Sequence, residues 1–226
     1  MKNSKCPGNQ AYTSEIASSY EVDRETEEIW HIEQDYLRRA VAKIAEASSL
    51  LDIPVGTGRF LPYYIEQNIG VVGVDISTAM LAEAAMKVNG ANVGMACGDA
   101  QQLAFSDDEF DYVVCWRLLH LIPPDQLLQV ISELARVAKG ILYFQAFVRG
   151  QDYYFLRLKK AISLLMGLNA VDAREIRSKW GHIKSYSHTE GFLLDSFKAA
   201  RLEVEAIDRL STYGALLVNC YVVRKR

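Results

Sequence analysis

The sequence predicts an α/β fold built on a doubly wound, mostly parallel sheet of seven strands with an antiparallel last strand. Two observations lead to this fold. Apolar runs alternate with helical segments from residue 49 onward, and the runs are continuously hydrophobic, as in parallel strands that helices cover on both faces. The last two runs are joined by a short connection around Tyr213 and Gly214, which favours antiparallel pairing of the final strands.

The N-terminal part is expected to be a loosely packed arm followed by one helix. Residues 1–20 look like the arm, whereas residues 24–47 carry Ile29, Leu37, Val41 and Ile44 on one helical face. Acidic residues crowd the start of this segment and basic residues its second half, which suits the helix dipole. We therefore expect residues 1–47 to add an arm and a helix to a single domain that spans residues 1–226.

Seven strands and four further helices are expected after this first helix. The strands fall at residues 49–53, 70–75, 92–96, 111–116, 141–147, 203–210 and 216–223. The helices fall at residues 59–67, after the capping residue Ser77, at residues 125–138 and at residues 191–200. The alternation of the two kinds of element indicates βαβ units, which bring the carboxyl ends of the parallel strands to one edge of the sheet.

Residues 149–186 break the alternation and are expected to form a helical, aromatic insertion. They contain Tyr153, Tyr154, Phe155 and Trp180, and the stretch 156–168 is amphipathic. Two interpretations stay open: the insertion closes over a ligand as a lid, or its rings complete a core over the edge of the sheet.

Composition and charge exclude several classes of function. The chain of 226 residues has a formal net charge of -3 and no long basic run, so a nucleic-acid partner is not expected. No apolar run approaches the roughly 20 residues that span a bilayer, and the N-terminus lacks the apolar centre of a signal peptide. We expect a cytoplasmic protein with no membrane partner and with buried, reduced cysteines, and the sequence leaves the oligomeric state open.

Three features at the ends of expected strands suggest a nucleoside site. The first is the run from Asp52 to Gly58, which holds two glycines that let the backbone approach a ligand closely. The second is Asp75, because a carboxylate at a strand end can accept both hydroxyls of a ribose. The third is Asp99, which follows the third strand and can accept the exocyclic amine of an adenine. Each feature alone has a plain structural explanation as a turn, a helix-start carboxylate or a loop carboxylate, but their order and spacing together are specific.

At this point the chain resembles the class I S-adenosylmethionine-dependent methyltransferases, whose fold is Rossmann-like. The resemblance covers roughly residues 20–223 and includes the region 107–122 around the fourth strand and the final antiparallel strand. It implies a soluble enzyme that transfers a methyl group from S-adenosyl-L-methionine to a small-molecule acceptor, with transfer to oxygen or nitrogen preferred.

The resemblance also implies which residues bind the cofactor. Asp52 would orient the amino group of the methionine part, and the loop residues Gly56, Thr57 and Gly58 would lie under that part. Asp75 and Ile76 would bind the ribose, and Asp99 and Ala100 the adenine. Trp116 and Arg117 would lie beside the methionine and sulfonium region. Asp75→Ala is therefore expected to weaken cofactor binding with little loss of folding.

One residue departs from the pattern of the family. Pro54 stands where the family usually has its first glycine, and proline lacks an N–H and fixes φ near −65°. This φ is compatible with the end of an extended strand. We therefore expect the loop to form, with a question over the strength of cofactor binding.

Methyl transfer to a hydroxyl or ammonium group also requires the loss of a proton, for which histidine is suited. His120, just past the fourth strand, and His182, in the insertion, are the candidate catalytic residues. A structural role for His120 stays open as the alternative. No metal site is expected, because no group of ligands has the required spacing.

Two other functions fit part of the pattern. A non-catalytic S-adenosylmethionine-binding protein, or an enzyme of other sulfonium chemistry, is compatible with the same fold. A nicotinamide-dependent oxidoreductase would share the glycine loop and Asp75. The oxidoreductase explains neither Asp99 nor the closing strand pair, and the loop lacks its third glycine.

Overall fold

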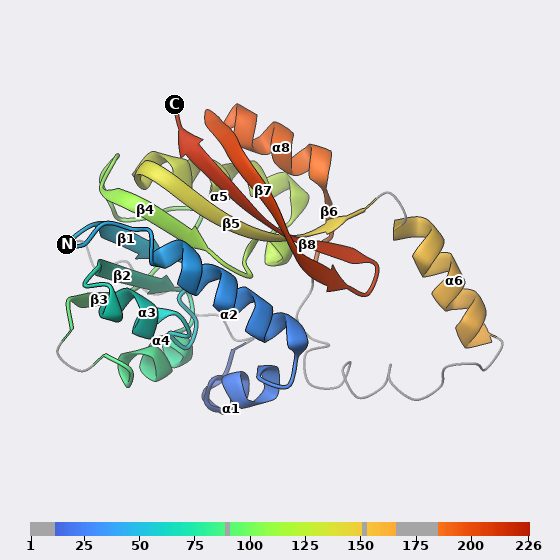
Figure 1. The fold of residues 1–226 in the computed structure, drawn as a ribbon, viewed down its shortest axis with the longest axis horizontal. Helices are drawn as coiled ribbons and strands as arrows, with labels where there is room; N and C mark the ends of the chain where they lie inside the picture. Colours follow the sequence, from blue (N-terminus) through green and yellow to red (C-terminus); the bar gives the residue numbers. More distant parts are fainter. Residues whose placement is uncertain (1–11, 89–90, 151–152, 166–184) are drawn as a thin grey trace.

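The computed structural model describes residues 12–88, 91–150, 153–165 and 185–226. The described strands form one sheet in the order β3-β2-β1-β4-β5-β8-β7, with β6 paired to β5 (Figure 1). Strands β1 to β5 pair in parallel, and β8 runs antiparallel to both β5 and β7. Their bounds are β1 Ser49–Asp52, β2 Gly70–Asp75, β3 Val93–Cys97, β4 Phe110–Cys115, β5 Ala138–Arg149, β6 His188–Thr189, β7 Leu202–Tyr213 and β8 Leu216–Lys225.

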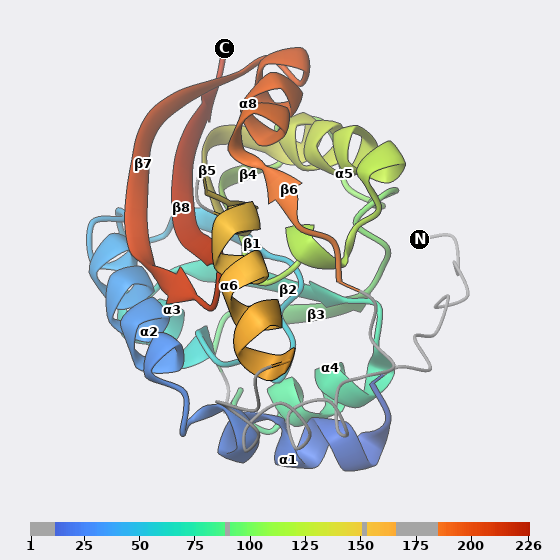
Figure 2. The ribbon, with the colours of Figure 1, turned by 90° about the vertical axis from the view of Figure 1, so that its right-hand side faces the viewer.

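Helices cover both faces of this sheet (Figures 1 and 2). Helices α2 (Glu28–Val41), α3 (Leu61–Glu66) and α4 (Thr78–Ala85) pack on one face, where Leu37, Leu61 and Tyr64 are fully buried. Helices α5 (Pro124–Val137) and α8 (Glu190–Ala199) pack on the other face, with Leu134 and Phe197 in the core. The doubly wound, mostly parallel fold expected from the sequence is confirmed.

The N-terminal region differs from the sequence-based expectation. Helix α1 (Ser14–Arg24) begins after the N-cap Thr13, so residues 14–20 are helical, and a second helix, α2, starts only at Glu28. Residues 24–47 thus contain the expected helix, α2, over a shorter range, whereas the expectation of a loosely packed arm was wrong for residues 14–20. Helix α1 buries only Ala17, so it has no apolar periodicity from which the sequence could reveal it.

An eighth strand joins the seven that the sequence predicts. Strand β6 is two residues long, and His188 and Thr189 pair in parallel with Val148 and Arg149 at the end of β5. Two residues are too few for a hydrophobic pattern, so the sequence could not reveal this strand. Its pairing anchors the chain as it enters α8, whose N-cap Thr189 accepts a hydrogen bond from the Phe192 backbone N–H.

The expected insertion is described in part. Helix α6 (Tyr153–Leu165) stands at one side of the sheet (Figure 1), while His182 and Trp180 lie outside the described residues. The side chains of Tyr154 and Phe155 are exposed on α6. Within the described part of the chain, no helix has both the length and the apolar character needed to cross a membrane.

The cysteines match their expected state only in part. Cys115 and Cys220 are free and buried in β4 and β8. Cys97 is disulfide-bonded, so the expectation of reduced thiols was wrong there. A disulfide is uncommon in the reducing cytosol, and this bond therefore does not support the expected cytoplasmic location.

Candidate functional site

A cavity of about 310 Å³ opens beyond the carboxyl ends of β1, β2, β3 and β4. Strand β1 lies between β2 and β4, so the strand order reverses at this point of the sheet. Such a reversal leaves a crevice in which open α/β sheets bind ligands. Eight of the ten residues that the sequence assigns to the cofactor line the cavity: Gly56, Thr57, Asp75, Ile76, Asp99, Ala100, Trp116 and Arg117.

The loop after β1 depends on its two glycines. Gly56 and Gly58 have φ values of 55° and 75°, in the left-handed region that side chains rarely adopt. A Cβ on Gly58 would lie 2.6 Å from Leu61 Cδ1, whereas a Cβ on Gly56 would meet nothing within 4 Å. Gly58 is thus required for packing and does not line the cavity, while Gly56 gives the loop an open surface. The loop forms with Pro54 in it, as expected.

Asp75 ties two loops together at the edge of this cavity. Its Oδ2 accepts the Gly56 backbone N–H at 2.9 Å, and its Oδ1 accepts the Ser77 backbone N–H at 2.8 Å. The carboxyl group is buried, which raises its pKa, while the N–H groups of Ser77, Gly56 and Ile76 oppose this shift. Ser77 in turn donates its hydroxyl to the Tyr12 carbonyl at 3.1 Å, so the segment before α1 is held against the same edge.

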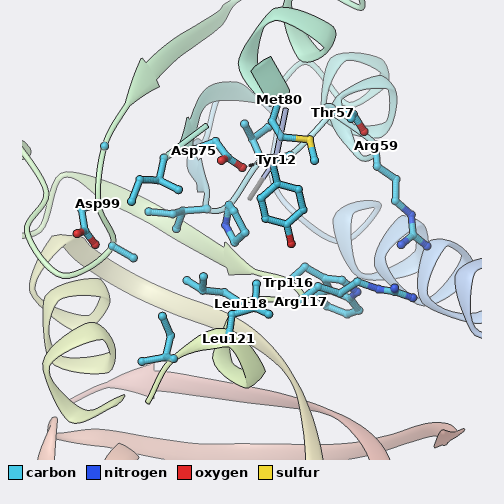
Figure 3. A pocket seen from close by; sticks show the side chains of 18 of the residues that line it. Tyr12, Thr57, Arg59, Asp75, Met80, Asp99, Trp116, Arg117, Leu118 and Leu121 are labelled. Carbon is cyan, nitrogen blue, oxygen red and sulfur yellow. Dashed lines mark hydrogen bonds between the residues drawn. The ribbon is translucent and has the colours of Figure 1, made fainter. Parts of the chain in front are cut away.

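Asp99 lies at the end of the cavity far from Arg59 and Arg117 (Figure 3), and the neighbouring Ala100 also lines the cavity. The Asp99 Oδ1 accepts the Gln101 backbone N–H at 2.9 Å, which fixes the turn after β3. The local carboxylate role and a ligand-binding role are compatible here, because Asp99 also lines the cavity.

Asp52 lies at the end of β1 but does not line the cavity. It is 1% exposed, and neither carboxyl oxygen has a hydrogen-bond partner. Burial raises the pKa of Asp52 to about 8; the nearby Tyr64 hydroxyl opposes this shift, and the Asp75 charge adds to it. Asp52 is thus buried at the end of β1, and its expected contact with the cofactor's amino group stays a prediction.

A buried ion-pair network closes the other end of the cavity. Glu33 is fully buried, and its Oε2 accepts hydrogen bonds from Arg59 Nη1 at 3.0 Å and from Arg117 Nε at 2.9 Å. Its Oε1 accepts Gln145 Nε2 at 3.0 Å, and Gln145 accepts the Arg117 backbone N–H at 3.1 Å. This last bond holds Arg117 at a φ of 55°, which is rare for a residue with a side chain.

Arg59 is a lining residue that the sequence analysis missed. Its guanidinium stacks over the Trp30 ring at 3.5 Å from the centroid, and it also donates to the Trp30 carbonyl. Figure 3 shows Arg59 and Arg117 together at one end of the cavity, with Asp75 and Tyr12 between them and Asp99. Its position in the sequence could have revealed Arg59 as a lining residue, because it directly follows the glycine loop at the start of a helical segment.

A second cavity, of about 450 Å³, shares part of its lining with the first. Tyr12, Tyr20, Arg117 and Leu121 line both cavities, so the two adjoin. His120 lies in the second cavity, on the short helix η1 (Leu119–Leu121) that follows β4.

His120 is neutral in the folded protein. Its ring centroid is 4.9 Å from that of Phe147, and its Nδ1 is buried with no hydrogen-bond partner. Burial and the charges of Arg117 and Arg24 lower the pKa of His120 to about 3. The imidazole is therefore a weak proton acceptor, because its burial and these nearby guanidiniums disfavour a positive charge on the ring.

Comparison with known proteins shows that the part of the chain that forms most of the first cavity is similar to methyltransferases. A family model described as a methyltransferase domain matches residues 50–140. A phosphatidylethanolamine N-methyltransferase from Cereibacter sphaeroides is 36% identical over 107 residues, which make up 45% of this chain and 51% of the relative. A demethylmenaquinone methyltransferase from Shouchella clausii is 34% identical over 102 residues, or 42% of this chain and 43% of the relative. The matches thus span about half the length of these curated relatives.

A solved structure resembles the chain over a longer range. Magnesium protoporphyrin IX methyltransferase from Synechocystis, solved with bound SAH, has a TM-score of 0.69 and 18% sequence identity. The superposition covers 95% of this chain and 96% of that chain. At this identity the likeness establishes the fold, including the antiparallel last strand.

Proposed function

Residues 50–140 belong to the class I S-adenosylmethionine-dependent methyltransferase family, and we propose on this premise that the chain is a methyltransferase for a small-molecule acceptor. S-adenosyl-L-methionine would occupy the first cavity and the acceptor the second. The observation that carries this proposal is that residues from four separate strand ends, each assigned from the sequence, line one cavity. In this proposal the two carboxylates, Asp75 and Asp99, the loop at Gly56 and the two arginines, Arg59 and Arg117, would line the length of a bound S-adenosyl-L-methionine.

The residues present fit the cofactor from end to end. Asp75 would accept the ribose hydroxyls, and Asp99 with the Ala100 backbone would meet the adenine. Gly56 offers backbone without a side chain where the methionine part would pass. Arg59 would attract the carboxylate of that part, because its Nε is buried and has no hydrogen-bond partner.

The bound sulfonium would supply an activated methyl group, so the chain need only align the acceptor and exclude water. Orientation of this kind supplies roughly 7–11 kcal/mol in favourable cases. Tyr12 and Tyr20 line both cavities and would separate the reacting groups from solvent. The expected lid role of residues 149–186 belongs to this proposal, supported by Tyr153 and Tyr186 in the lining of the second cavity.

His120 is the candidate proton acceptor for an oxygen or nitrogen acceptor atom. Its buried, unpartnered Nδ1 is the feature that supports this role, because an imidazole nitrogen without a partner in the protein is available to a ligand. Its low pKa means that proton acceptance would require a ligand that offsets the nearby positive charge. His182 keeps its proposed catalytic role from the sequence alone, since it lies outside the described residues.

Calorimetry tests the cofactor half of this proposal. S-adenosylhomocysteine should bind the wild-type chain, and NAD⁺ should not, whereas the reverse result would favour an oxidoreductase. The transfer half requires a methyl-labelled donor and a low-molecular-weight extract, from which one labelled product should form. Retained S-adenosylhomocysteine binding with no label transferred to any extract would favour a non-catalytic binding protein.

A further inference from the structure

The second cavity has an unusual charge composition. Its charged lining residues within the described chain are Arg24, Arg117 and Arg157, and no carboxylate lies among them. The other lining residues are mostly aromatic or apolar, namely Tyr12, Tyr20, His120, Leu121, Phe147, Tyr153, Ser185, Tyr186, Ser187, Tyr213 and Leu216. A ligand in this cavity therefore meets cations and ring faces together.

Two of these arginines, Arg24 and Arg117, contact carboxylates that do not themselves line the second cavity. Glu27 lies 2.9 Å from Arg24 Nη1 and 3.8 Å from Arg117 Nη2, and Glu33 is shared between Arg117 and Arg59. Among the described residues, Glu27 therefore contacts Arg24 and Arg117, and Glu33 contacts Arg117 and Arg59. The Nη2 of Arg117 is buried and has no hydrogen-bond partner, because Glu27 is beyond hydrogen-bond distance.

Arg157 adds a further cation from α6. Its Nη1 donates to the Tyr153 hydroxyl at 3.1 Å, its guanidinium lies 5.7 Å from that ring's centroid, and it forms no ion pair within the described residues. Since an unopposed guanidinium pairs strongly with a planar carboxylate, this end of the cavity favours an anion.

The aromatic walls favour a planar ligand body. Phe147 makes edge-to-face contacts with His120 and with Tyr213, at centroid distances of 4.9 and 5.7 Å. Rings arranged edge to face present a slot into which another ring packs well. Arg117 lines both cavities, so a ligand bound here would lie next to the methionine end of the first cavity.

We propose that the second cavity binds an aromatic acceptor that carries a carboxylate, with Arg157, Arg24 and Arg117 around the anion and Phe147 and Tyr213 against the ring. This inference rests on the proposed function, since it identifies the acceptor class of the same site. The carboxylate would also offset the positive charge beside His120.

A matched pair of probes tests the charge preference. The probes are 6-hydroxy-2-naphthoate and its neutral amide, 6-hydroxy-2-naphthamide, titrated by calorimetry into the full chain saturated with S-adenosylhomocysteine. The carboxylate should bind at least about tenfold more tightly than the amide, as expected for a charge-assisted pair with arginine. Arg157→Gln should reduce this preference to about threefold or less. Lys159→Gln is the control, because Lys159 is exposed on the same helix and does not line the cavity.

The outcomes separate this inference from the proposed function. If S-adenosylhomocysteine itself fails to bind, the proposed function is wrong. If S-adenosylhomocysteine binds but the amide binds as tightly as the carboxylate, or neither probe binds, only the acceptor class is wrong. An equal loss of preference in Arg157→Gln and Lys159→Gln would also overturn it, because general surface charge would then explain the effect. Arg24→Gln, with an unfolding curve to verify folding, provides a second variant from a different helix.

Discussion

The Asp75 carboxylate accepts the backbone N–H of Gly56 at 2.9 Å, so the end of β2 holds the loop that follows β1. A second bond, from the Ser77 N–H at 2.8 Å, fixes the start of α4 to the same carboxylate. One side chain therefore organises two of the loops around the cavity before any ligand binds. The site is built in advance by the protein, and its carboxylate has a structural role beside the proposed ribose role.

Asp75→Ala is expected to weaken both binding and folding. The dissociation constant of S-adenosylhomocysteine should rise about 10-fold to 100-fold, the loss expected for charge-assisted hydrogen bonds to a ribose. The free energy of unfolding should fall by about 1–3 kcal/mol, because the buried Ser77 N–H and the partly buried Gly56 N–H lose their acceptor. The sequence suggested little effect on folding, and the two backbone bonds change that expectation. Calorimetry and urea unfolding measure the two effects, with the exposed Asp35→Ala as control; unchanged affinity would remove Asp75 from the ribose site.

Alanine substitutions at Gly56 and Gly58 should distinguish the glycine that is needed for packing of the loop from the one that is needed for ligand binding. Gly58→Ala places a Cβ 2.6 Å from Leu61 Cδ1 and 3.1 Å from Ala84. The free energy of unfolding should therefore fall by about 2–4 kcal/mol. Gly56→Ala meets no atom within 4 Å and should cost only about 1 kcal/mol for its positive φ. Its S-adenosylhomocysteine affinity should nevertheless fall, since Gly56 lines the cavity and Gly58 does not. Equal stability of the two variants in urea would contradict this assignment.

The sequence predicted the strand-end residues because their position follows from chain order alone. Asp75 and Asp99 each follow a parallel strand, and parallel strands end on one edge, so no side-chain detail was needed. The contacts of Glu33 could not be predicted in the same way. It joins Arg59 and Arg117, which are 26 and 84 residues away, and a glutamate in an amphipathic helix gives no sign of full burial.

Local signal strength explains the other differences. Helix α1 buries a single residue and β6 contains only two, so neither produces a period that can be recognised. The second cavity depends on side chains from α1, η1, α6 and β7 that only the tertiary structure brings together. His120 could be proposed from its place after the fourth strand, whereas its neutral state follows from its burial and from the positions of Arg117 and Arg24, which only the tertiary structure shows.

His120 should make the protein less stable in mild acid. Its pKa is about 3 when folded and about 6.5 when unfolded, so between these values only the unfolded state takes up the proton. The free energy of unfolding should therefore fall by up to about 1.4 kcal/mol per unit as the pH drops below 6.5. His120→Gln should lose this part of the slope between pH 7.5 and pH 5, whereas the exposed His31→Gln should keep it. Parallel urea-unfolding profiles for wild type and His120→Gln would contradict the burial of a neutral imidazole.

Asp52 should have the opposite effect on the pH profile of stability, because its contribution decreases as the pH rises. Its pKa is about 8 when folded and about 3.8 when unfolded, so the folded state holds a proton that the unfolded state has lost. This contribution to stability is complete below pH 3.8 and declines by up to about 1.4 kcal/mol per unit as the pH rises toward 8. Asp52→Asn should accordingly gain stability relative to wild type from pH 5 to pH 8, while Asp35→Asn should not. An advantage that stays constant with pH would show that Asp52 is already ionised.

Glu33→Gln is expected to be the most damaging of these changes. Glu33 is fully buried and receives hydrogen bonds from Arg59, Arg117 and Gln145. A neutral amide would take the counter-charge from Arg59 and leave Arg117 with only the longer 3.8 Å contact to Glu27. Removal of one partner from a buried pair costs about 3–5 kcal/mol, which the midpoint of urea unfolding would report. Glu28→Gln is the control, because Glu28 is exposed in the first turn of the same helix. A loss below about 1 kcal/mol, within the range of exposed ion pairs, would mean that water reaches both arginines and that this end of the cavity is open rather than closed.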